Sequence, residues 1–72
     1  MKVTELTREQ LVEVKQSYLT QLADEGAFAE VLDVDYDAPS YDDMANADEI
    51  VPDSVIFEHY ADTEFTTDDF NL

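Results

Sequence analysis

Every Lys and Arg of this chain lies within its first 15 residues, and this distribution limits what the chain can fold into. The sequence carries 19 Asp and Glu against 3 Lys and Arg, a formal net charge of −16. The basic residues stand beside an equal number of acids: Lys2, Arg8 and Lys15 with Glu5, Glu9 and Glu13. We therefore expect a neutral beginning joined to a polyanion, whose self-repulsion opposes compaction.

The apolar content is nevertheless that of a folded protein. Hydrophobic residues make up 44% of the 72 residues, whereas disordered acidic tails contain few. A chain of this length buries only about 60% of the surface of its unfolded form, so we expect one small acidic domain over residues 1–72. The absence of Cys favours a reducing compartment. Without a bilayer-spanning run or a signal-peptide core, the sequence predicts a cytoplasmic protein.

A long N-terminal helix over residues 8–25 is the clearest element. Leu11, Val14, Tyr18 and Leu22 recur at spacings of three and four and form one apolar stripe. Both ends are marked, by a capping box at the start and by a glycine suited to a left-handed stop: Thr7 with Gln10, and Gly26.

Residues 27–36 carry two competing patterns. Phe28, Val31 and Leu32 suit another helical turn. Leu32, Val34 and Tyr36 instead alternate with Asp residues, as in a strand. Such a strand needs a partner, for which residues 64–67 are the candidate.

Two short helices are predicted beyond Pro39. Ser40, with Asp43 three residues on, marks the N-cap of a helix over residues 41–49. We expect this helix to turn three side chains inward and three outward: Tyr41, Met44 and Ala45 against Asp42, Asn46 and Glu49.

The second short helix runs from Asp53 or Ser54 to about residue 61, with Ile56 and Tyr60 on its buried side. The tail over residues 63–72, which contains Phe65 and Phe70, either wraps back onto the core or stays mobile. The predicted fold class is mainly α, with one long N-terminal helix and two short ones, and a short strand pair is the alternative.

No residue set in the sequence predicts catalysis, a metal site or a cofactor. Asp33, Asp35 and Asp37 match the first acidic positions of a calcium-binding loop, but its glycine and final Glu are replaced by Ala38 and Met44. His59 is the only histidine and lacks a second ligand at a metal-binding spacing, so we expect a surface residue. A nucleophile, an activated base and an anion hole are not found together, so we expect no enzyme.

The acids of the middle segment are the predicted partner-binding residues: Asp33, Asp35, Asp37, Asp42, Asp43, Asp48 and Glu49. If residues 33–37 are extended, alternate carboxylates lie about 6.6 Å apart, comparable with phosphates along a nucleic-acid strand. We also expect crowding to raise carboxyl pKa values, so that mild acid or added salt stabilises the fold.

The chain resembles very short acidic proteins of bacterial phages and other mobile elements. The resemblance rests on three stretches: Met1-Lys2-Val3-Thr4-Glu5-Leu6-Thr7-Arg8-Glu9-Gln10-Leu11, the segment from Tyr41-Asp42-Asp43 to Asp48-Glu49, and Phe65-Thr66-Thr67-Asp68-Asp69-Phe70. More loosely, size and charge are similar to those of anti-CRISPR inhibitors that mimic DNA.

This resemblance implies an inhibitor that occupies the basic nucleic-acid-binding surface of a CRISPR effector, or of a restriction enzyme or repressor. Direct binding to nucleic acid or to an anionic membrane is disfavoured by the charge. The alternative is an adaptor that docks on a host protein through aromatic and acidic residues without imitating DNA, and its affinity would depend chiefly on Tyr41, Phe57, Phe65 or Phe70.

Overall fold

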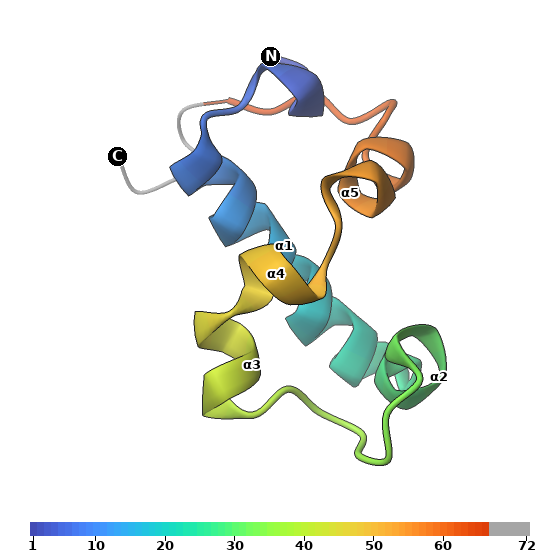
Figure 1. Cartoon of the computed structure of the whole chain (residues 1–72). Helices are drawn as coiled ribbons and strands as arrows, with labels where there is room; N and C mark the ends of the chain where they lie inside the picture. The colour runs from blue at the N-terminus through green and yellow to red at the C-terminus, as the bar shows by residue number, and fades with distance from the viewer. Residues whose placement is uncertain (67–72) are drawn as a thin grey trace.

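The longest element of the fold is the helix α1, Arg8–Glu25, and the shorter elements pack around it (Figure 1). The computed structural model describes residues 1–66. In chain order the elements are the 3-10 helix η1 (Val3–Glu5), α1, α2 (Phe28–Leu32), α3 (Tyr41–Ala45), α4 (Ala47–Ile50) and α5 (Asp53–His59). Over that range the protein is mainly helical and contains no strand, as the leading prediction has it.

Both ends of α1 are where the sequence predicts them. The Thr7 side chain accepts a hydrogen bond from the Gln10 backbone N–H at 3.2 Å, and the Gln10 side chain accepts one from the Thr7 N–H at 2.9 Å. These two bonds complete the capping box and satisfy amides that the helix cannot pair. At the other end Gly26 has φ 72°, the left-handed conformation that favours glycine.

The predicted apolar stripe of α1 forms the centre of the core. Leu11, Val14, Tyr18 and Leu22 are all buried, together with Leu19. The stripe is covered by side chains from the remaining elements: Val3, Leu6, Phe28, Ala47, Val51, Ile56 and Phe65. No helix within residues 1–66 combines the length and the apolar character needed to cross a membrane.

The ambiguous segment after Gly26 forms a helix, and the strand alternative is wrong within the described residues. Phe28 starts α2 and is fully buried. The helix stops at Asp33, whose φ of 56° places it in the left-handed region. Residues 33–38 then form a turn and bends, so the extended 33–37 stretch with its regular carboxylate spacing does not occur.

The predicted helix over residues 41–49 is interrupted at Asn46 and forms two helices, α3 and α4. Its start is confirmed, because the Ser40 side chain accepts from the Asp43 N–H at 3.2 Å. Ala47, the first residue of α4, is fully buried. Tyr41, predicted to face inward, is instead 90% exposed.

Two further details of residues 41–49 can be compared with the prediction. Ala45 is exposed, although an inward position was expected, while Met44 is partly buried as predicted. The three side chains predicted to face water are all exposed: Asp42, Asn46 and Glu49.

The last helix and the segment after it return the chain to its beginning. In α5, Ile56 is fully buried and Tyr60 packs against the core just after the helix ends. Phe65 is buried, its N–H donates to the Met1 carbonyl at 2.8 Å, and its carbonyl accepts from the Met1 ammonium at 2.6 Å. Residues 63–66 therefore wrap onto the core, whereas Phe70 lies outside the described residues.

The two left-handed helix stops generate a matched pair of substitutions. A Cβ at Gly26 would meet nothing within 4 Å, so Gly26→Ala carries only the left-handed strain and should lower the unfolding free energy by about 1 kcal/mol. Asp33→Gly removes that strain and should cause no loss. Thermal melts check both, with an expected fall of about 4–8 °C for Gly26→Ala. Equal losses in the two variants would contradict this account.

Candidate functional site

The basic residues of α1 are held in an internal charge cluster made by Arg8, Lys15, Asp48 and Asp53. The Lys15 side chain is only 1% exposed. Its ammonium donates to the Asp53 carboxylate at 2.6 Å, and to the Asp48 carboxylate and backbone carbonyl at 2.9 and 3.1 Å. All three N–H donors of this buried ammonium are thereby satisfied, as a buried charge requires.

Arg8 closes the charge cluster on its exposed side. Its guanidinium binds Asp53 through two parallel bonds of 3.0 Å and reaches Asp48 at 2.8 Å. Two positive and two negative groups thus compensate one another. Because Asp48 lies in α4 and Asp53 begins α5, the charge cluster joins both helices to α1.

The pKa values of the charge cluster follow from these contacts. Burial lowers the pKa of Lys15, but hydrogen bonds to Asp53 and Asp48 raise it by more, so the net shift is upward. Hydrogen bonds from Arg8 and Lys15 hold the pKa of Asp53 well below its usual range, and hydrogen bonds from Lys15 and Arg8 also lower that of Asp48.

Lys2, the third basic residue, forms an ion pair with an acid that lies near the other end of the described sequence. Its ammonium lies 3.2 Å from the Glu64 carboxylate, which the Met1 ammonium also approaches at 3.3 Å. The expectation that Glu5, Glu9 and Glu13 balance the basic residues is therefore wrong. Acids distant in sequence do so: Asp48, Asp53 and Glu64.

An acidic pole lies at the end of the molecule away from η1, on the last turn of α1, on α2, on the loop before Ser40 and on α3 (Figure 1). We define it by its eight carboxylates: Asp24, Glu25, Glu30, Asp33, Asp35, Asp37, Asp42 and Asp43. The sequence has no Lys or Arg after residue 15, so no basic side chain belongs to these elements. All eight are exposed except Asp43, which is partly buried.

The seven predicted partner-binding acids divide between two places. Five belong to the acidic pole: Asp33, Asp35, Asp37, Asp42 and Asp43. The other two lie in α4, where Glu49 is exposed and Asp48 is committed to the charge cluster. Sequence reasoning missed the structural role of Asp48, and it missed Lys15, although Leu11, Lys15 and Leu19 follow one another at helical steps of four.

The acidic pole is held together by side-chain contacts. The Tyr36 ring packs on Phe28 of α2 with centroids 5.7 Å apart, and its hydroxyl lies near the Asp43 carboxylate of α3. This carboxylate raises the pKa of Tyr36. The pKa of Asp43 is lowered, first by the Ser40 N–H and then by Tyr36. Tyr36 therefore links α2 to α3.

The acidic pole also carries exposed apolar side chains. Of the four large hydrophobic residues exposed in residues 1–66, three come from its elements: Val31 at 50%, Tyr36 at 44% and Tyr41 at 90%. The fourth, Val55, lies in α5. The pole thus combines negative charge with an aromatic ring in water, a combination that suits protein interfaces.

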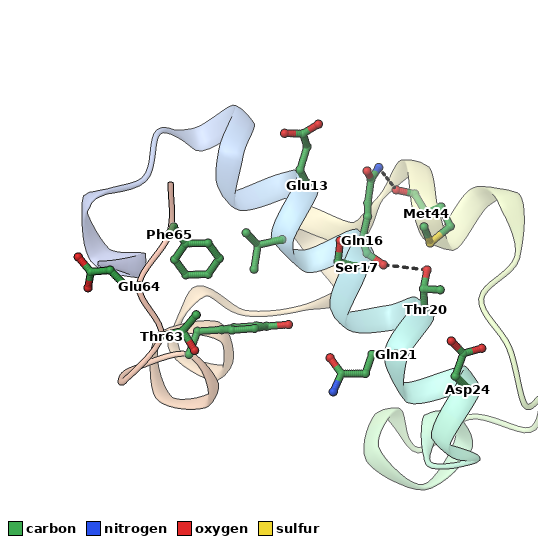
Figure 2. Close-up of a pocket in the computed structure, with 12 residues that line it drawn as sticks. Glu13, Gln16, Ser17, Thr20, Gln21, Asp24, Met44, Thr63, Glu64 and Phe65 are labelled. Atoms are coloured by element: carbon green, nitrogen blue, oxygen red, sulfur yellow. Dashed lines mark hydrogen bonds between the residues drawn. The ribbon is translucent and has the colours of Figure 1, made fainter. Parts of the chain in front are cut away.

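A groove of about 690 Å³ runs along the exposed side of α1, between α3 and the segment around Phe65 (Figure 2). Val14, Met44, Tyr60 and Phe65 supply its apolar lining, and the carboxylates Glu13, Asp24 and Glu64 also line it. The Gln16 amide donates to the Met44 carbonyl at 2.9 Å, which ties α3 to α1 (Figure 2). The groove continues the negative surface toward the centre of the molecule.

The remaining candidates for chemistry are structural or dispersed. His59 is exposed and packs edge-on against the rings of Tyr18 and Tyr60, with centroids 5.0 and 4.7 Å away. Within residues 1–66, no three Asp, Glu or His side chains are grouped so that they could hold a metal ion.

Comparisons with protein families, with curated proteins and with solved structures find no match to this chain.

The charge cluster predicts a large difference between two Asp→Asn substitutions. Asp53→Asn leaves Lys15 and Arg8 with one carboxylate and should lower the unfolding free energy by about 2 kcal/mol, less than for fully buried pairs because Asp53 is 36% exposed. Asp35→Asn, an exposed loop position, should change it by less than about 0.5 kcal/mol. Urea melts of both variants measure the contrast, and similar small effects would show that the charge cluster does not stabilise the fold.

The lowered carboxyl pKa values also set the direction of the pH dependence. Groups whose folded pKa is depressed stabilise the protein above their unfolded pKa and lose this contribution as the pH falls through the folded value. Acidification below about pH 4 should therefore destabilise the protein, through Asp43, Asp48, Asp53 and Glu64.

Urea melts at pH 7, pH 4 and pH 2.5 test this. On acidification, the unfolding free energy of Asp53→Asn should fall by less than that of the natural sequence. For these four carboxyls the expected upward shift from crowding is wrong, because hydrogen bonds and ion pairs outweigh repulsion. Higher stability at pH 2.5 than at pH 4 would contradict this, and would show that repulsion between carboxylates controls the stability of the fold.

Proposed function

We propose that this protein is an acidic inhibitor that occupies the nucleic-acid-binding surface of another protein by imitating DNA. The observation that carries the proposal is the separation of charge. All three Lys and Arg form ion pairs with acids outside the acidic pole, so none of them neutralises its eight carboxylates. A basic groove would meet an uncompensated negative field there.

The density of charge supports the same proposal. The molecule is 35 Å long and 22 by 19 Å across. Residues 1–66 hold 17 acids against 3 bases, a net charge of −14. Duplex DNA of about the same length carries roughly 20 phosphate charges, at one per ~1.7 Å of axis. A protein surface built to bind duplex DNA would therefore meet a similar charge over a similar length.

The first candidate partner is a CRISPR effector, and a restriction enzyme or a repressor comes next. Each of these holds DNA in a track lined with Lys and Arg, the feature that a negative protein surface complements. The resemblance to short acidic phage proteins and to DNA-mimicking inhibitors supports this order, and it implies action in a bacterial host cell.

A second candidate function is an adaptor that docks through aromatic side chains without imitating DNA. The exposure of Tyr41 favours it. Two of the aromatics expected to serve this role are committed to packing instead, since Phe65 is buried and Phe57 packs against the core. Phe70, the other expected aromatic, lies outside the described residues.

Two variants with equal net charge distinguish the effect of where the carboxylates lie from the effect of the total charge. The first neutralises the acidic pole by Asp33→Asn, Asp35→Asn, Asp37→Asn and Asp42→Asn, and it leaves the charge cluster intact. The second removes four charges elsewhere by Glu9→Gln, Glu13→Gln, Glu58→Gln and Asp62→Asn. Circular dichroism first establishes that both are folded.

Each protein is then titrated into a Cas9-type effector, a restriction endonuclease and a repressor, each bound to a labelled duplex that carries its own site. We expect displacement of the duplex from at least one of them, weaker in added salt and reduced at least tenfold in the first variant only. Equal displacement by the two variants would contradict an acidic pole that imitates DNA. Partner binding that is weakened only by Tyr41→Ala, and with which the duplex does not compete, would favour the adaptor.

A further inference from the structure

Within residues 1–66, Tyr41 is the most exposed of the large hydrophobic side chains, at 90%. Tyrosine rings usually contribute buried apolar area, and an exposed ring adds little to stability. Nothing in the packing of α3 accounts for an aromatic residue at this position. A tyrosine held in water on a charged surface is instead typical of the residues that dominate binding energy at protein interfaces.

The backbone that carries Tyr41 is held at several points. It is the first residue of α3, directly after the Ser40 cap, whose N–H also donates to Asp43 at 3.1 Å. At its other end α3 is tied to α1 by the bond from Gln16 to the Met44 carbonyl. The ring is thus presented from a fixed base, which reduces the entropy lost on binding.

The chemistry around the ring selects one kind of partner group. Asp42 follows Tyr41 directly and is exposed, Asp43 also belongs to α3, and the other carboxylates of the acidic pole lie on α1, α2 and the loop before Ser40. Negative charge beside an aromatic face attracts a cation, and a guanidinium can stack on the ring while binding a carboxylate through its N–H groups. An ammonium has no plane to stack and is more strongly hydrated.

We propose that Tyr41 is the anchor of the acidic pole and stacks on an arginine of the basic partner, whose guanidinium is bound at the same time by a carboxylate of the pole. The argument for this occupant is charge complementarity, and it rests on the proposed function. It adds a specificity that charge alone does not give, because a purely electrostatic surface treats arginine and lysine tracks alike.

The test uses defined probes in place of the unidentified partner. Fluorescein-labelled octa-arginine and octa-lysine are titrated with the full chain at low salt, and the ratio of the two Kd values is measured. We expect Tyr41→Ala to lower the preference for octa-arginine about two- to fivefold, the range for a cation–π contact at an exposed site. Binding of octa-lysine should change much less.

Two variants control this measurement. Tyr41→Phe keeps the aromatic face and should retain most of the preference, whereas Val55→Ala removes an exposed apolar group of α5 and should leave the ratio unchanged. Circular dichroism confirms folding, and Tyr41→Ser replaces Tyr41→Ala if the latter melts early. An identical preference in the natural sequence and in Tyr41→Ala would overturn the proposal.

Failure here and failure of the proposed function have different signatures. If Tyr41→Ala keeps the arginine preference while the neutralised acidic pole no longer displaces DNA, the anchor is wrong and the imitation of DNA stands. If neutralising the pole changes neither displacement nor peptide binding, the proposed function itself fails.

Discussion

A single charge cluster ties two of the short helices, α4 and α5, to the long one. Lys15 projects from the same face of α1 as its apolar stripe and is almost fully buried, so its ammonium must find partners inside the fold. Asp48 and Asp53 provide them from two different helices, and Arg8 compensates the second negative charge. A buried ion pair contributes less net stability than its contacts suggest, because desolvation opposes it, but an arrangement that leaves it unpaired is strongly disfavoured. The charge cluster therefore discriminates against other packings of α4 and α5 more than it adds to the free energy of folding.

The same pairing shapes the surface. The chain has very few basic residues, and the fold uses all of them to neutralise acids at structural positions, so the remaining carboxylates face solvent without a compensating basic side chain. The ion pairs lie toward η1 and the middle of α1, and the carboxylates of the acidic pole lie away from them, on the last turn of α1, on α2, on α3 and on the loop between those two helices (Figure 1). The internal ion pairs and the negative surface both follow from the small number of basic residues in the chain.

Charge and the exposed aromatic ring act over different ranges. The field of many carboxylates reaches about a Debye length, near 8 Å at physiological salt, and it accelerates encounter with any basic surface. In the proposed complex, the Tyr41 ring would act only on contact and would distinguish one cation from another. Their placement on one end of a small molecule, with Tyr36 linking the two helices beneath them, is the arrangement that a surface for a basic, DNA-binding partner would use.

The sequence by itself determined the elements whose signals are local. The stripe from Leu11 to Leu22, the capping boxes at Thr7 and Ser40 and the stop at Gly26 depend on neighbours within one or two turns, and all are found in the structure. Only the tertiary structure decided the partners of Lys15 and Arg8, because Asp48 and Asp53 lie more than 30 residues away along the chain and no periodicity encodes that pairing. It also decided the exposure of Tyr41. Which side chains α3 and α4 turn to the core depends on how they dock against the other elements, which no local signal encodes: Ala47 and Val51 are buried, and the Tyr41 ring is left in water.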